Sequence, residues 1–129
     1  MKLFSLGLLL LSLLTFNSCK TSAQNGYKDL QGAQYNQVLK DKQAIVIDVR
    51  TPGEVREGYI PEATLFFDYN GANFEQQIQK LDKSKTYIVY CRSGGRSAGA
   101  STIMAEKGFK NVYNLQGGMM QWRGPVKKP

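Results

Sequence analysis

Histidine is absent from the whole chain of 129 residues. Its absence excludes a Cys-His dyad, a Ser-His-Asp triad and every metal site that needs an imidazole ligand. A nucleophile in this protein must therefore become reactive without a histidine base beside it.

Cysteine is also scarce, because only Cys19 and Cys91 occur in the chain. If Cys19 is used for another purpose, Cys91 is the single free thiol, and an internal disulfide cannot form. Two-cysteine redox motifs and cysteine-based zinc motifs are then excluded as well. A lone thiol in a protein expected to be exported needs a reason, because that compartment is usually oxidising.

Long apolar runs are missing except at the N-terminus, where residues 3–16 follow Lys2. This run is short for a membrane-spanning helix and is typical of a secretory signal. Ser18 directly precedes Cys19, which resembles a bacterial lipoprotein signal. We therefore expect residues 1–18 to be removed, Cys19 to carry lipid, and the exported chain to be anchored to a membrane of the periplasm or cell envelope. An ordinary cleaved signal peptide with an incidental cysteine is the alternative.

The remaining chain is long enough for one domain. Residues 19–28 are small and polar and predict a flexible tether, so the domain is expected over 29–126. The formal net charge is +7, from 17 basic and 10 acidic residues. No arginine-rich tract or interleaved aromatic pattern supports nucleic-acid binding. The positive charge suits an anionic membrane, a small anionic substrate or simply a lysine-rich surface.

Short β-branched runs alternate with helical patterns along this domain. Strands are expected at 44–48, 64–67, 86–91 and 111–115, helices at 29–42, 73–83 and 97–108, and a loop at 49–63. This alternation predicts an α/β fold with a mostly parallel sheet. Sites in such sheets lie beyond the carboxyl ends of the strands, where Asp48 and Cys91 are expected.

The segment around Cys91, CRSGGRS, is suited to a thiolate, which is the reactive form of cysteine. Gly94 and Gly95 allow successive N–H groups to point inward as an anion-binding nest. The following helix presents its positive end, and Arg92 and Arg96 add permanent charge. A tight turn with surface arginines is the structural alternative.

The spacing within this loop narrows the chemistry. Four residues separate Cys91 from Arg96, whereas cysteine-dependent phosphatases have five residues between cysteine and arginine. A loop shorter by one residue fits one extra sulfur atom more naturally than a tetrahedral phosphoryl group. The spacing therefore favours a Cys91 persulfide.

These features together resemble the rhodanese-like family of single-domain sulfurtransferases. The resemblance implies a central, mostly parallel, five-stranded sheet with helices on both faces. The resemblance covers roughly residues 29–126 and depends on three segments: DVRTPGEVREGYIPEA at 48–63, CRSGGRS at 91–97 and LQGGMMQW at 115–122. Tyr59 stands where the family usually has histidine, and Glu62 where it usually has glycine. We interpret that segment as structural support, so activity should survive these departures.

The resemblance implies roles for individual residues and no cofactor. Cys91 would take sulfane sulfur from a small anionic donor such as thiosulfate and pass it to a thiol or a cyanide-like acceptor. The amides of the active loop would cradle the persulfide, and Arg92 and Arg96 would hold the donor. The expected substrate-binding residues are thus Arg92, Ser93, Gly94, Gly95, Arg96 and Ser97. The expected supporting ion pairs involve Asp48, Arg50 and Glu54, whereas Tyr59 and Trp122 are expected to pack.

Two other functions stay open at this point. A non-enzymatic module of the same fold could carry a persulfide or bind a partner. Retention of Cys91 with both arginines speaks against an inactive module. A phosphatase or arsenate reductase of the same fold is disfavoured by the loop length.

Overall fold

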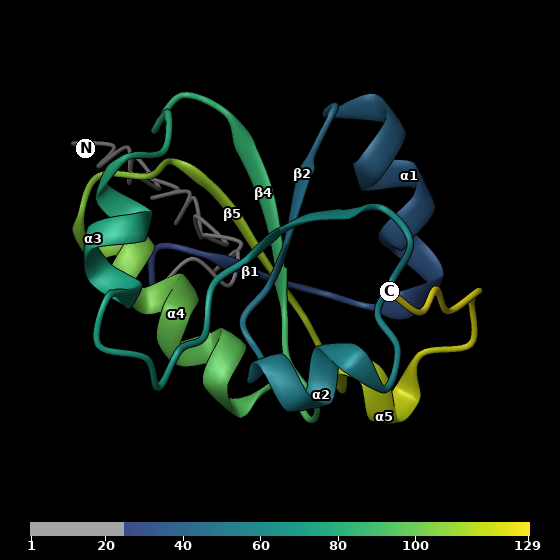
Figure 1. The fold of residues 1–129 in the computed structure, drawn as a ribbon. Helices are drawn as coiled ribbons and strands as arrows, with labels where there is room; N and C mark the ends of the chain where they lie inside the picture. Colours follow the sequence, from purple (N-terminus) through teal and green to yellow (C-terminus); the bar gives the residue numbers. More distant parts are fainter. Residues whose placement is uncertain (1–24) are drawn as a thin grey trace, which may run out of the picture.

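The computed structural model describes residues 25–129 as one layered α/β unit (Figure 1). The predictions for the signal peptide and for lipid at Cys19 lie outside the described residues. Strands and helices alternate along the chain. The strands are β1 Lys28–Leu30, β2 Ile45–Asp48, β3 Ala63–Phe66, β4 Thr86–Tyr90 and β5 Asn111–Leu115. The helices are a 3-10 turn η1 Gly32–Gln34, α1 Tyr35–Asp41, α2 Pro52–Arg56, α3 Phe74–Gln79, α4 Gly95–Glu106 and α5 Gly118–Gln121.

The five strands form one sheet in the order β1-β5-β4-β2-β3, and every pair is parallel. Helices α3 and α4 cover one face, and α1 and α5 cover the other (Figure 1). The predicted α/β class, the five-stranded sheet and the helices on both faces are therefore confirmed.

The apolar runs in the central strands follow from this arrangement. Ile47 and Val89 face the α3 and α4 layer, whereas Val46 and Ile88 face the α1 and α5 layer. All four side chains are at most 1% exposed. A strand buried on both faces has no polar alternation, and full burial of each such side chain contributes about 1.5–3 kcal/mol.

The first strand and the first helix differ from the prediction. Lys28–Leu30 form β1 against β5, although residue 28 was expected in a tether and 29–30 in a helix. The α-helix begins only at Tyr35, after the 3-10 turn. Tyr27 already packs against the core, so the folded domain begins before residue 29.

The expected loop at 49–63 contains helix α2, which begins at Pro52. Thr51 caps this helix, because its hydroxyl accepts from the Glu54 N–H at 3.3 Å while Glu54 Oε2 accepts from the Thr51 N–H at 3.0 Å. This reciprocal pair is a capping box. Beyond α2, Tyr59 pairs with Lys127 through two backbone hydrogen bonds of 2.8 Å, which fixes the C-terminal tail. Within residues 25–129, no helix has the length and apolar character needed to cross a membrane.

Candidate active site

Asp48 and Cys91 meet at the carboxyl edge of the sheet, as the sequence predicts. Strands β2 and β4 are neighbours, with Asp48 in register with Tyr90, and Cys91 follows Tyr90 directly. The Val49 N–H donates to the Tyr90 carbonyl at 3.0 Å, which keeps the two chains side by side beyond the last paired residues.

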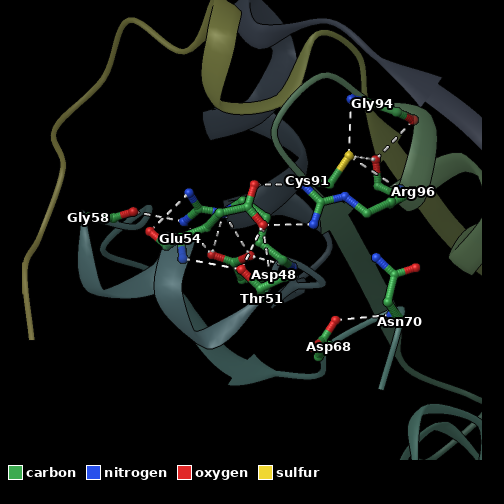
Figure 2. Close-up of polar contacts among 11 residues, drawn as sticks. Asp48, Thr51, Glu54, Gly58, Asp68, Asn70, Cys91, Gly94 and Arg96 are labelled. Carbon is green, nitrogen blue, oxygen red and sulfur yellow. Dashed lines mark hydrogen bonds and ion pairs between the residues drawn. The ribbon is translucent and has the colours of Figure 1, made fainter. Parts of the chain in front are cut away.

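The Cys91 sulfur lies at the base of a turn that leads into α4 (Figure 2). The side chain is 1% exposed. Its Sγ accepts from the Gly94 N–H at 3.1 Å and the Ser97 N–H at 3.4 Å, and it contacts the Ser97 hydroxyl at 3.4 Å. Gly94 precedes the helix with a φ of +102°, a conformation that glycine adopts without strain. The backbone therefore curls so that its donors face the sulfur.

These donors lower the pKa of the Cys91 thiol. Burial raises the pKa, but hydrogen bonds from the Ser97 hydroxyl and from the N–H groups of Ser97, Gly94 and Ser93 outweigh it. Hydrogen bonds to the charged form favour that form. The two arginines were expected to contribute as well; of these, Arg96 interacts with Cys91 through its charge, since Cys91 raises the pKa of Arg96. The thiolate is thus favoured by the loop itself and by the start of α4.

Arg96 is occupied by an ion pair that the sequence reasoning did not assign to it. Its Nη1 and Nη2 donate to the two carboxylate oxygens of Glu54 at 2.8 and 2.7 Å (Figure 2). Arg96 was expected to hold the substrate, and Glu54 was expected to pair within a supporting network. The pair joins α2 to the start of α4. The Arg96 guanidinium is the main reason that the pKa of Glu54 falls to about 2.

A buried polar cluster supports the edge of the sheet below the loop. Asp48 is 0% and Arg50 6% exposed, and the Arg50 Nη2 donates to Asp48 Oδ2 at 2.7 Å. The Tyr90 hydroxyl donates to the same oxygen at 2.6 Å and accepts from the Ile60 N–H at 3.1 Å. Arg50 Nη2 also donates to the Gly58 carbonyl at 2.7 Å. Each charge is therefore matched, and the segment after α2 is tied to β2 and β4.

Helix α5 contacts the Cys91 loop through two backbone hydrogen bonds. The Met119 N–H donates to the Cys91 carbonyl at 3.0 Å, and the Met120 N–H donates to the Arg92 carbonyl at 2.9 Å. Because these two carbonyls point toward α5, the N–H groups that come after them in the Cys91 loop are free to face the sulfur. Gly118 makes this approach possible, since a Cβ on it would lie 2.2 Å from the Cys91 carbonyl oxygen.

Gly118→Ala is therefore expected to push the loop away and raise the pKa of Cys91. Losing one amide contact to the thiolate removes part of the hydrogen bonding that lowers the pKa of Cys91, so that pKa should rise toward its ordinary value. The rate of iodoacetamide alkylation should fall most below the ordinary thiol pKa of about 8.5, because the intact loop keeps more thiolate there, and it should approach that of the parent protein at high pH.

Gly108→Ala is the matched control for this prediction. Gly108 also has a positive φ, of +95°, but a Cβ there would meet only the Lys83 side chain at 3.9 Å. Both variants carry the same kind of backbone strain, roughly 1 kcal/mol or more, and only Gly118 touches the loop. Equal alkylation profiles for the two variants would show that α5 does not position Cys91.

The remaining expected residues have varied surroundings. Arg92 and Ser93 are exposed on the loop, and Gly95 is exposed at the start of α4. Arg92 forms no ion pair within residues 25–129. Tyr59 packs edge-on against Phe66 at 5.0 Å between ring centroids, in agreement with the expected packing role. Trp122 packs in the same way against a further aromatic ring, that of Tyr35. No group of acidic or cysteine side chains in the described part of the chain is placed to hold a metal ion.

Comparison with known proteins identifies the family of this chain. A family model described as a rhodanese-like domain matches residues 32–125. A putative sulfurtransferase of Bacillus subtilis, YtwF, is 41% identical over 87 residues, which cover 67% of this chain and 81% of that protein. A tRNA uridine(34) hydroxylase of Pelagibacter ubique is 34% identical over 95 residues, which cover 74% of this chain and 32% of that protein.

A solved structure shares the same fold. The rhodanese-like domain protein of Staphylococcus aureus superposes with a TM-score of 0.69 at 25% identity, covering 79% of this chain and 98% of that one. The family model spans both the Asp48–Glu54 segment and the Cys91 loop. The chain therefore belongs to the rhodanese-like domain family.

Proposed function

We propose that this protein is a sulfurtransferase that carries sulfane sulfur on Cys91. The observation that carries the proposal is the Cys91 sulfur, which is buried at the base of a turn and faces two backbone N–H donors and a hydroxyl. That arrangement favours a thiolate and offers donors to a second sulfur bonded to it. The putative sulfurtransferase among its relatives supports the same chemistry.

The reaction consists of two transfers. In the first, the Cys91 thiolate attacks the outer sulfur of a donor such as thiosulfate. The Sγ–S bond forms as the S–S bond of the donor breaks, and the electron pair leaves with sulfite. In the second, a thiol or cyanide attacks the outer sulfur of the persulfide, and Cys91 leaves as a thiolate. The lowered thiol pKa replaces a general base in both steps.

The width of the loop favours sulfur over phosphate. The Gly94 and Ser97 N–H groups lie 3.1 and 3.4 Å from Sγ, so the turn closes tightly around the sulfur of Cys91 itself. A phosphoryl group needs donors arranged around three outer oxygens, which a turn with only four residues between Cys91 and Arg96 is too short to provide.

Parallel assays test this proposal. The purified domain is offered thiosulfate or a small organic persulfide with cyanide as the acceptor, and separately an aryl phosphate. We expect thiocyanate to form and phosphate release to stay at the background level. Phosphate release that depends on Cys91, without sulfur transfer from either donor, would instead favour the phosphatase alternative. A persulfide that forms without turnover would favour a non-enzymatic carrier.

We also propose that the protein works at a membrane of the cell envelope, anchored through lipid on Cys19. The apolar run at 3–16, followed by Ser18 and Cys19, supports this location. In fractionated cells, the Cys19→Ser variant should no longer be found in the membrane fraction. If it stays in that fraction with unaltered mass, the anchor is not on Cys19.

A further inference from the structure

The charge of Arg96 is balanced before any substrate arrives. Glu54 accepts from both terminal nitrogens of the guanidinium, at 2.7 and 2.8 Å. Asp68 also lies close enough to raise the pKa of Arg96, as does Cys91. Arg50 cannot hold an anionic substrate in place of Arg96, because it is buried in its own pair with Asp48. Of the basic residues around the loop, only Arg92 is exposed and forms no ion pair within residues 25–129.

Glu54 is also held in place from its own helix. Its Oε2 accepts from the N–H and the hydroxyl of Thr51, each at 3.0 Å, in addition to the bond from Arg96. The carboxylate is therefore preorganised at the start of α2 and does not have to be recruited from solvent. Moving Arg96 toward a substrate would break two charge-assisted hydrogen bonds, which are the stronger kind.

From this geometry we propose that Glu54 selects the sulfur donor by neutralising Arg96, so that the site prefers persulfides of low net charge, R–S–SH, to the thiosulfate dianion. The proposal rests on the sulfurtransferase function and defines its donor class. A persulfide donor gives its outer sulfur to the Cys91 thiolate, and its S–S bond breaks. The electron pair then leaves with R–S⁻, which takes up the proton.

The difference between the donors lies in the charge that the site must accept. Thiosulfate brings two negative charges toward a thiolate and releases sulfite with the same two charges. A persulfide that carries its own ammonium group brings little net charge and releases a thiol. With Arg96 balanced by Glu54, the cradle offers its N–H donors, and of the two loop arginines only the exposed Arg92, which forms no ion pair within residues 25–129, is left to attract a sulfonate group. Local charge of one sign raises or lowers the encounter rate of charged substrates by tenfold or more.

The test compares two donors on the parent protein and on Glu54→Gln. Glutamine keeps the capping box with Thr51 and removes the charge that neutralises Arg96. Single-turnover sulfur transfer to Cys91 is followed with thiosulfate and with cysteamine persulfide. We expect the rate constant with thiosulfate to rise about tenfold at low salt. The rate constant with cysteamine persulfide should change by less than about twofold.

Two further variants make the result specific. Glu75→Gln removes an equal charge from α3, where Glu75 is 65% exposed and pairs with Lys107 at 3.5 Å, and it should leave the donor ratio unchanged. Adding Arg96→Gln to Glu54→Gln should cancel the gain with thiosulfate, because that gain depends on the released guanidinium.

The outcomes separate this proposal from the function on which it rests. If neither donor adds sulfur to Cys91 in the parent protein, the sulfurtransferase function fails, and the donor preference fails with it. If sulfur is added but Glu54→Gln changes the rate constants with both donors by the same factor, so that their ratio is unaltered, only the selection by Glu54 is overturned. A folded Glu54→Gln variant, checked by thermal unfolding, that loses activity with both donors would likewise overturn the selection.

Discussion

Cys91→Ser is expected to reduce sulfur transfer to the level measured without protein, while the fold stays intact. A serine oxygen cannot hold a sulfane sulfur, so neither transfer can occur. The side chain is nearly the same size, and the Gly94 and Ser97 N–H groups that face Sγ can still donate to the hydroxyl. The buried core around residue 91 should therefore be little disturbed.

Thiocyanate formation from thiosulfate, and from an organic persulfide, measures this effect. Thermal unfolding is followed in parallel, and we expect the free energy of unfolding to change by less than about 1.5 kcal/mol, because the swap nearly conserves volume. Transfer by a well-folded Cys91→Ser protein at a substantial fraction of the parent rate would show that another group carries the sulfur.

Arg50→Ala is expected to cause the largest loss of stability, about 3–5 kcal/mol. The substitution leaves the Asp48 carboxylate buried with only the Tyr90 hydroxyl and the backbone N–H of residue 50 as donors. It also removes the donor to the Gly58 carbonyl. A buried charge without its ionic partner is costly, because it has lost its hydration and two neutral donors do not replace that hydration.

Urea unfolding measures the change as a shift of the midpoint. Arg56→Ala serves as the control, because Arg56 lies exposed at the end of α2 and should change stability by no more than about 0.5 kcal/mol. Adding Asp48→Asn to Arg50→Ala should restore part of the loss, since it removes the unmatched charge. Equal, small effects of the two arginine substitutions would contradict the structural role of the buried pair.

The Cys91 loop could be predicted because its information is local. The cysteine, the two glycines and the start of α4 lie within seven residues, and the strand before them is a continuous apolar run. Gly94 and Ser97 contact the sulfur as the spacing indicates. The α/β class and the parallel sheet followed from the alternation of patterns, because parallel strands need helical crossovers.

The missed features depend on partners that are distant in sequence. Strand β1 has only three residues, and it is a strand because β5 lies beside it. Glu54 and Arg96 are 42 positions apart, so no local pattern shows that one neutralises the other. The contact of Gly118 with the Cys91 carbonyl is of the same kind. Helix α2, in contrast, has a local signal, since Thr51 and Glu54 have the spacing of a capping box and thereby mark the start of a helix.

Intact mass measurement of the domain after exposure to an organic persulfide tests the central claim most directly. The account predicts a gain of one sulfur atom, located on Cys91 by peptide mapping, absent in Cys91→Ser and removed by cyanide or a small thiol. Thiosulfate should give the same adduct more slowly. A protein that gains no sulfur from either donor, or that instead gains a phosphoryl group on Cys91 from an aryl phosphate, would contradict the account.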